Sequence, residues 1–164
     1  MLALSPPGDE TPSAAPLFED PLTEVILGAC LEVHSVLGPG LFESVYEQCL
    51  CHELELRGLH FERQRPVPIR YKRVILDCGY RADLVVEGRV LLELKTVEAV
   101  QPVHLAQVLT YIKLLSLDVG LLVNFNVPRL RQGIRRLTRK VPHTSSLSPC
   151  LPVEHPVQSD GVGT

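Results

Sequence analysis

Two amphipathic helices are expected in the first third of the chain. Apolar residues recur at helical spacing from Leu22 to Leu37, and again from about Phe42 to Arg57. The Gly38-Pro39-Gly40 run ends the first helix, and Gly58 is well placed as the C-terminal glycine of the second. The pattern therefore predicts a helical pair ahead of any sheet.

The apolar period then shortens to that of β-strands. Strand-like segments lie near Phe61–Tyr71, at Val74–Val86 and at Arg89–Thr96, and Pro66 and Pro68 interrupt the first of them. Short connections between successive strands favour antiparallel pairing. These three segments predict an antiparallel meander.

A helix and a buried strand follow the meander. About 15 residues, Val103–Leu117, have helical character, and the uniformly apolar run Val119–Phe125 is typical of a buried strand. A strand reached through a helix is most easily parallel to its predecessor. A short basic helix is expected from about Arg129 to Lys140. The fold class is thus α/β, with a mixed central sheet flanked by helices.

Composition fits one folded domain with a tail at each end. The 164 residues are 45% hydrophobic, and residues 21–140 hold all the periodic segments. Residues 1–20 and 141–164 are rich in Pro and Ser without periodicity, which predicts disordered tails. The chain has neither an apolar run of roughly 20 residues, as a membrane span needs, nor a secretory signal. We therefore expect a cytoplasmic protein that spans no membrane, with reduced, scattered cysteines rather than a zinc site.

The net charge of −3 conceals a basic central segment. All 16 Lys and Arg residues lie between Arg57 and Lys140, where only seven acidic residues occur, so this segment carries +9. A near-neutral whole chain is thus a poor argument against a polyanionic partner such as nucleic acid.

Charged residues interrupt two apolar strands. Glu93 and Lys95 stand two residues apart in Arg89–Thr96, so both point to one face. On local sequence alone, an ion pair on a solvated face explains them. Asp83 changes this view, because it is another charge in an apolar strand, placed just before the turn at Glu87-Gly88.

The loop between these strands decides whether the two carboxylates can meet. A two-residue turn at Glu87-Gly88 would place Asp83 and Glu93 on opposite faces. An odd loop, Val86-Glu87-Gly88 with Gly88 left-handed, pairs Asp83 with Leu91 and makes Glu93 its diagonal neighbour on the same face. The functional interpretation therefore requires an odd loop.

Converged carboxylates favour a hard divalent cation. Asp83 and Glu93 would repel each other unless a cation joined them, and oxygen ligands select Mg²⁺ or Mn²⁺ over zinc. Lys95 could then orient the attacking water, stabilise hydroxide or neutralise charge on a pentacovalent phosphate.

Asp83 is followed, after nine intervening residues, by Glu93-Leu94-Lys95. This arrangement resembles the split signature of the PD-(D/E)XK nuclease superfamily. The resemblance implies a restriction-endonuclease-like core. It also implies that Asp83 and Glu93 bind the metal, with the backbone carbonyl of Leu94 as a further ligand, and that Lys95 serves catalysis.

A second motif, Gly40-Leu41-Phe42-Glu43-Ser44-Val45-Tyr46, is similar to the one that names the GxxExxY protein family, and the similarity continues through most of residues 22–138. In related nucleases an early-helix glutamate assists the metal site, which makes Glu43 a candidate catalytic residue and metal ligand. The alternative is that Gly40 caps the helix and Glu43, at its third position, interacts with the helix dipole.

A third motif lies on the Val103–Leu117 helix. Gln107-Val108-Leu109-Thr110-Tyr111 resembles the QxxxY motif of RecB-type nucleases, and implies that Gln107 and Tyr111 support the site and contact substrate. His104 shares their helical face, but a capping or surface role is favoured for it.

The basic terminal helix offers phosphate contacts. Arg131, Arg135 and Arg139 follow one another at steps of four residues, which on a helix forms one stripe suited to binding substrate. A solvated face is the alternative.

Together these features predict a metal-dependent nuclease that hydrolyses phosphodiester bonds in nucleic acid, with DNA favoured over RNA. The alternatives are a catalytically silent module on the same fold, binding nucleic acid or protein, and a small-molecule enzyme that uses the same carboxylates.

Overall fold

A computed structural model describes residues 20–139, so the two tails expected at 1–20 and 141–164 lie outside the described residues, except for Asp20. Two helices open the fold, α1 (Pro21–Leu37) and α2 (Glu43–Leu56). Asp20 caps α1, since its carboxylate accepts hydrogen bonds from the Thr23 amide at 3.0 Å and the Thr23 hydroxyl at 2.6 Å. Both helices agree with the sequence prediction.

A five-stranded mixed sheet forms the centre of the molecule, in the order β1-β4-β5-β6-β7. Its strands are β1 (Phe61–Pro66), β4 (Arg81–Val86), β5 (Val90–Lys95), β6 (Val119–Asn124) and β7 (Ile134–Thr138). Helix α3 (Pro102–Leu114) connects β5 to β6, which run parallel, and the other neighbouring strands are antiparallel. The predicted α/β class and mixed sheet, consistent with a restriction-endonuclease-like fold, are confirmed.

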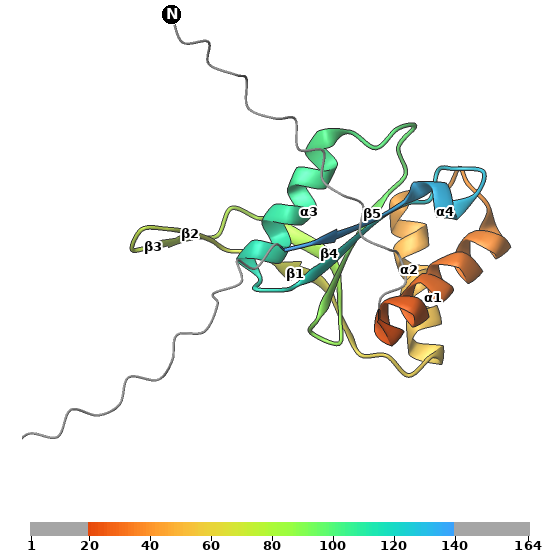
Figure 1. Cartoon of the computed structure of the whole chain (residues 1–164), viewed down its shortest axis with the longest axis horizontal. Helices are drawn as coiled ribbons and strands as arrows, with labels where there is room; N and C mark the ends of the chain where they lie inside the picture. Colours follow the sequence, from red (N-terminus) through yellow and green to blue (C-terminus); the bar gives the residue numbers. More distant parts are fainter. Residues whose placement is uncertain (1–19, 140–164) are drawn as a thin grey trace, which may run out of the picture.

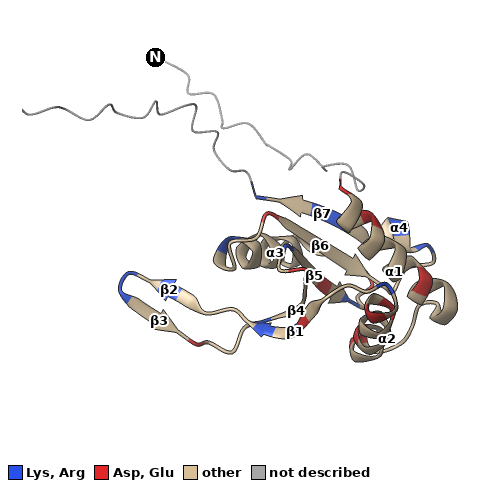
Figure 2. Cartoon of the chain, turned by 90° about the horizontal axis from the view of Figure 1, so that it is seen from below, with Lys and Arg blue, Asp and Glu red and all other residues tan. Residues whose placement is uncertain are grey.

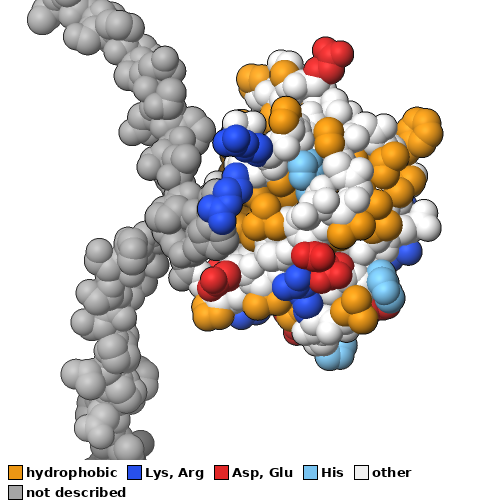
Figure 3. All heavy atoms as spheres, turned by 90° about the vertical axis from the view of Figure 1, so that its right-hand side faces the viewer, with side chains coloured by type: hydrophobic (Ala, Val, Ile, Leu, Met, Phe, Trp, Pro, Cys, Tyr) orange, Lys and Arg blue, Asp and Glu red, His pale blue; other side chains and the backbone are white. Residues whose placement is uncertain are grey.

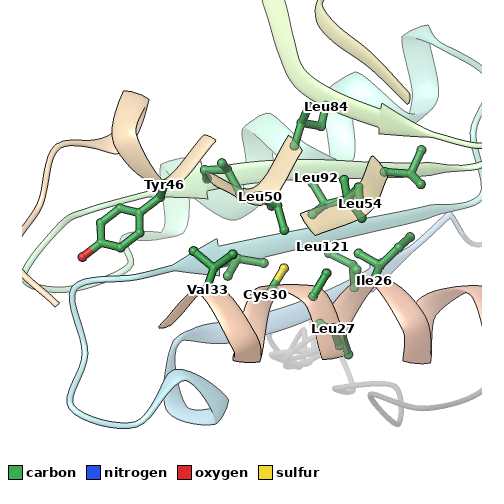
Figure 4. Close-up of a cluster of buried hydrophobic side chains, with 14 of the residues drawn as sticks. Ile26, Leu27, Cys30, Val33, Tyr46, Leu50, Leu54, Leu84, Leu92 and Leu121 are labelled. Atoms are coloured by element: carbon green, nitrogen blue, oxygen red, sulfur yellow. The ribbon is translucent and has the colours of Figure 1, made fainter. Parts of the chain in front are cut away.

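Helices cover both faces of the sheet (Figure 1). On β5, Val90, Leu92 and Leu94 pack in one apolar cluster with α1 and α2, while Leu91 packs in a second cluster with α3. Figure 4 shows the first cluster, in which Leu92 of the sheet lies among side chains of the two helices. The strand period of two thus divides each buried strand between two cores.

The outer side of α1 and α2 is largely apolar. Figure 3 shows hydrophobic side chains gathered on this side of the molecule, with charged groups between them. Val36 is 72% exposed and Phe42 83% exposed. A hollow between the two helices is lined by residues that include Val33, Leu37 and Cys49.

Two predicted long strands are each divided in the structure. Instead of Phe61–Tyr71 and Val74–Val86, the chain leaves the main sheet after Pro66 and forms a separate hairpin of β2 (Ile69–Tyr71) and β3 (Val74–Leu76). Pro66 and Pro68 lack the amide protons that a continuing ladder needs. Figures 1 and 2 show the hairpin projecting away from the main sheet.

The predicted basic helix from Arg129 to Lys140 is wrong. Only one helical turn forms, α4 (Leu130–Gly133), and the chain then continues as β7. Strand β7 hydrogen-bonds to β6, and Ile134 and Leu137 enter opposite cores. Pairing the backbone of a buried strand outweighs the helix propensity of arginine.

None of the helices formed by residues 20–139 has the length and apolar character that crossing a membrane requires. The cytoplasmic location expected from the sequence stays a prediction.

Close packing of α3 on β6 provides a test of the fold. A methyl group added at Gly120 would lie 2.5 Å from Val108 Cγ1 and 3.0 Å from Ile112 Cγ2. We expect Gly120→Ala to lower the free energy of unfolding by about 1–3 kcal/mol through overpacking. The matched control is Gly28→Ala in α1, where the nearest atom is the flexible end of Arg57 and the better helix propensity of alanine should stabilise the protein by up to about 1 kcal/mol. Urea unfolding of both variants checks this, and equal stabilities would contradict the packing.

Candidate functional site

An odd loop between β4 and β5 brings the two predicted carboxylates together. Val86 pairs with Val90 and Leu84 with Leu92, so the loop is Glu87-Gly88-Arg89. The same register, continued by one residue, sets Asp83 across from Glu93. The odd loop that the functional hypothesis requires is present, but it lies one residue later than Val86-Glu87-Gly88, so Asp83 faces Glu93 directly and not Leu91. Both Glu87 and Gly88 have left-handed φ angles, 52° and 61°.

The Asp83 carboxylate is held by the neighbouring strands. Its Oδ2 accepts a hydrogen bond from the Leu94 amide at 2.8 Å, and its Oδ1 accepts one from Gln64 Nε2 at 3.3 Å. Burial raises the pKa of Asp83, although the Leu94 amide and Lys95 oppose the shift. The carboxylate is therefore fixed in position, and its neighbours compensate its negative charge less well than water would.

Glu93 is the more buried carboxylate, with only 2% of the residue exposed. Its Oε1 accepts hydrogen bonds from Lys95 Nζ at 2.7 Å and Gln107 Nε2 at 2.8 Å. Its Oε2 is buried and has no hydrogen-bond partner within the described residues. Burial, and next the charge of Asp83, raise the pKa of Glu93 to about 7. One carboxylate oxygen is thus left without compensation.

Lys95 is held against this pair. Burial acts to lower the pKa of Lys95, but the hydrogen bond to Glu93 and the charges of Glu93, Glu43 and Asp83 outweigh it and raise the pKa. The lysine therefore stays protonated at neutral pH.

Helix α3 presents the predicted polar face to the same place. Gln107 Nε2 reaches Glu93 at 2.8 Å and the Tyr111 hydroxyl at 3.2 Å. His104 instead accepts a hydrogen bond from the Gln101 amide at 3.0 Å and caps the helix. The structure thus brings Gln107 and Tyr111 to the site and gives His104 the capping role.

Glu43 reaches the site from the other side of the sheet. Helix α2 begins at Glu43 with Phe42 as its cap, so the alternative of a Gly40 cap with Glu43 at the third position is wrong. Burial raises the pKa of Glu43; Lys95 opposes this shift, whereas Asp83 and Glu47 add to it. Glu43 is therefore close enough to share the electrostatic field of the site.

A family model for the PD-(D/E)XK nuclease superfamily matches residues 20–137, which is almost the whole described domain. The chain belongs to the PD-(D/E)XK nuclease superfamily. No curated protein and no solved structure gives a significant match. Membership indicates a nuclease domain, and the region matched contains every strand and helix described above except the last residue of β7.

PD-(D/E)XK nucleases typically use divalent metals, and the carboxylates fit one in part. Within residues 20–139 no group of three or more His, Cys, Asp and Glu side chains is already arranged as a metal-binding cluster. Asp83, Glu93 and Glu43 therefore do not form a ready-made three-ligand site. The buried, unpartnered Oε2 of Glu93 and its repulsion from Asp83 are the features that a hard cation would relieve.

Two residues at the candidate site were not predicted. Glu47, one turn after Glu43 on α2, is 8% exposed and binds Arg63 at 2.8 Å and Gln64 at 2.7 Å. Gln64 also contacts Asp83, and its φ of 48° is in the left-handed region. The four-residue spacing of Glu43 and Glu47 is a signal that sequence reading could have used.

Asn124, the last residue of β6, is a further polar residue at this end of the sheet. It is 2% exposed, its Oδ1 accepts the Val97 amide at 3.1 Å, and its Nδ2 donates to the Val97 carbonyl at 2.8 Å. It thereby fixes the chain just after Lys95, at the carboxyl end of the paired strands β5 and β6.

The predicted arginine stripe does not exist in this nuclease domain, since Arg135 belongs to β7 and Arg131 to α4. Arg139 contacts Asp118 at 3.2 Å, next to the start of β6 and hence at the end opposite the site. Arg135 donates to the backbone carbonyls of Gln132 and Ile134 at 2.8 Å. A role for Arg131, Arg135 and Arg139 in substrate binding stays a prediction, but the three residues do not share the helix on which it was based.

The pKa of Glu93 gives a stability test in metal-free buffer. Its pKa of about 7 lies above the ordinary 4.5, so the folded state binds the proton more tightly than the unfolded state. This stabilisation is complete below about pH 4.5 and is lost as the pH rises through about 7. We expect the Tm in EDTA to fall between about pH 5 and pH 8, and to fall less in Glu93→Gln. The exposed Glu98→Gln is the control, and identical pH profiles for all three proteins would contradict the assignment.

Proposed function

We propose that this domain is a Mg²⁺- or Mn²⁺-dependent nuclease of the GxxExxY group that hydrolyses phosphodiester bonds in nucleic acid, with DNA preferred to RNA. The observation that carries the proposal is the buried Asp83–Glu93–Lys95 arrangement, in which Glu93 keeps one oxygen unsatisfied. Such a group costs folding free energy, and a role in binding a cation accounts for its retention. The family match supports nuclease chemistry in general.

In this proposal Asp83 and Glu93 hold the cation, and Glu43 assists, directly or through water. When bound, the cation supplies polarisation of a phosphoryl oxygen and a lowered pKa for a coordinated water. Asp83 is oriented for this by the Leu94 amide, and Glu93 by Gln107. These partners fix both carboxylates before substrate arrives, which limits reorganisation during the reaction.

Lys95 is proposed to stabilise negative charge on the phosphate. Its pKa is raised by Glu93 and the other carboxylates against the effect of burial, so it is a poor general base at neutral pH. A fixed ammonium beside the carboxylates suits charge stabilisation and orientation of the attacking water. Of the roles open to this lysine, proton abstraction is thus the least favoured.

The test is cleavage of labelled single- and double-stranded DNA and RNA by the purified chain with Mg²⁺ or Mn²⁺. We expect Asp83→Asn and Lys95→Ala to lower the cleavage rate by roughly 10²–10³-fold, and EDTA to abolish it. Glu98→Gln changes an exposed carboxylate near the site and should keep full activity. Equal cleavage by wild type and both site variants, or binding by all of them without any cleavage, would refute catalysis and favour a silent binding module.

Gln64 offers a second test, because it acts on the metal site through Asp83. Loss of such a supporting group typically weakens metal affinity or activity by about 10–100-fold. We expect Gln64→Ala to raise the Mg²⁺ concentration needed for half-maximal cleavage more than it lowers the rate at saturating Mg²⁺. Gln48→Ala, on the exposed side of α2, is the control. A rate loss that Mg²⁺ cannot restore would contradict a role for Gln64 in positioning Asp83.

A further inference from the structure

The β2–β3 hairpin, here called the arm (residues 67–80), stands apart from the main sheet (Figures 1 and 2). It forms a sheet of its own with three residue pairs, Ile69 with Leu76, Arg70 with Ile75 and Tyr71 with Val74. A two-stranded hairpin is only marginally stable by itself. Its length and projection call for a function beyond connecting β1 to β4.

Large apolar side chains on the arm are exposed to solvent. The exposed fraction is 62% for Tyr71, 53% for Val74, 61% for Ile75 and 43% for Leu76. Apolar groups clustered at an exposed site often mark a binding surface. By the register of the two strands, Tyr71, Val74 and Leu76 share one face of the arm, and Ile75 lies on the other. The first face is therefore apolar, and a partner could cover it.

The tip of the arm is basic, as Figure 2 shows. Arg70, Lys72 and Arg73 lie within four residues, and Asp77 is the only acidic residue between positions 67 and 80. Within residues 20–139 none of the three cations forms an ion pair, and Lys72 Nζ lies 5.4 Å from the centre of the Tyr71 ring. The tip thus offers uncompensated positive charge to an anionic partner.

The foot of the arm leads to the proposed catalytic groups. Tyr80 meets Tyr111 edge to face, with ring centres 6.3 Å apart. A hollow at this point is lined by residues that include Ile69, Tyr80, Gln107 and Tyr111. Because Gln107 also binds Glu93, the hollow adjoins the carboxylates.

We infer that the arm and the hollow at its foot bind a single-stranded segment of nucleic acid beside the phosphate to be cleaved, an inference that rests on the proposed nuclease function. A single strand presents both base faces and phosphates, which match the apolar and cationic groups of the arm. A duplex hides its base faces and would leave Tyr71 and Val74 uncovered. The basic tip contacts phosphates, and a base stacks in the hollow against Tyr80.

The test measures binding of a labelled single-stranded DNA, the same strand as RNA, and its duplex, in EDTA so that no cleavage occurs. The arm variant is Lys72→Glu with Arg73→Glu. Its matched control, with the same change in charge, is Arg89→Glu with Arg129→Glu, two exposed positions that do not line the hollow at the foot of the arm. We expect the arm variant to weaken single-strand binding at least about tenfold and to lower the salt slope by about 1.4, since each lost contact removes roughly 0.7. The control should change the affinity less than about twofold.

A third variant, Tyr71→Ser with Val74→Ser, tests the apolar face, since these two residues pair with each other. Stacking contributes about 1–3 kcal/mol per base, so we expect at least about fivefold weaker binding with an unchanged salt slope. Circular dichroism and Tm confirm that each variant is folded, which is expected because neither change touches the two cores.

Several results would overturn the inference. One is that the arm variant and the control bind single-stranded DNA with equal affinity, and another is that the arm variant loses duplex binding as much as single-strand binding. A third is that the wild type binds no nucleic acid. A fourth is that the arm variant changes only the molar mass of the protein measured by light scattering. The last result would make the arm a contact between copies of the chain. Cleavage is followed separately: wild-type cleavage with unaffected arm-variant binding overturns the arm alone, whereas arm-dependent binding without cleavage overturns the nuclease proposal alone.

Discussion

The burial of Glu93 on β5 is the constraint on which the rest of the site depends. A carboxylate inside a central strand must be compensated, and among residues 20–139 only one of its oxygens has hydrogen-bond partners, Lys95 and Gln107. Helix α3 must therefore pack where Gln107 can reach β5, and Gly120 on β6 permits that approach by lacking a side chain. The same contacts that hold the helix on the sheet also orient the carboxylate, so the packing of α3 and the position of Glu93 depend on each other.

Compensation spreads outward from Glu93 in two directions. On one side Gln107 connects to Tyr111, and on the other Asp83 connects through Gln64 to Glu47 and Arg63. In each step, a side chain nearer the surface donates or accepts a hydrogen bond and so compensates the more buried group. Residual repulsion between Asp83 and Glu93 is nevertheless retained. Natural proteins keep such local instability where chemistry requires it.

Sequence reasoning succeeded where local pattern decides structure and failed where pairing decides it. Helix α1 and the parallel β6 follow from periodicity and from the connecting helix. The same-face placement of Asp83 and Glu93 depended on an odd loop, which the sequence left open and the structure contains. The sequence of Arg129–Lys140 does not by itself predict strand β7. This strand forms because its backbone pairs with β6, which lies outside that segment. Gln64 was missed for a similar reason, since its role depends on β1 lying next to β4 and on an unusual backbone angle.

The three-residue loop Glu87–Arg89 has an evolutionary consequence. Each residue gained or lost in a hairpin loop shifts the register by one and turns every side chain of the following strand to the other face of the sheet. Loss of one loop residue would separate Asp83 from Glu93 without altering either of them, whereas loss or gain of two would keep them on one face. Among homologues, loop lengths at this position should therefore differ by even numbers wherever both carboxylates are kept. A homologue with an even loop would keep the residues that correspond to Asp83, Glu93 and Lys95, but its two carboxylates would lie on opposite faces of the sheet.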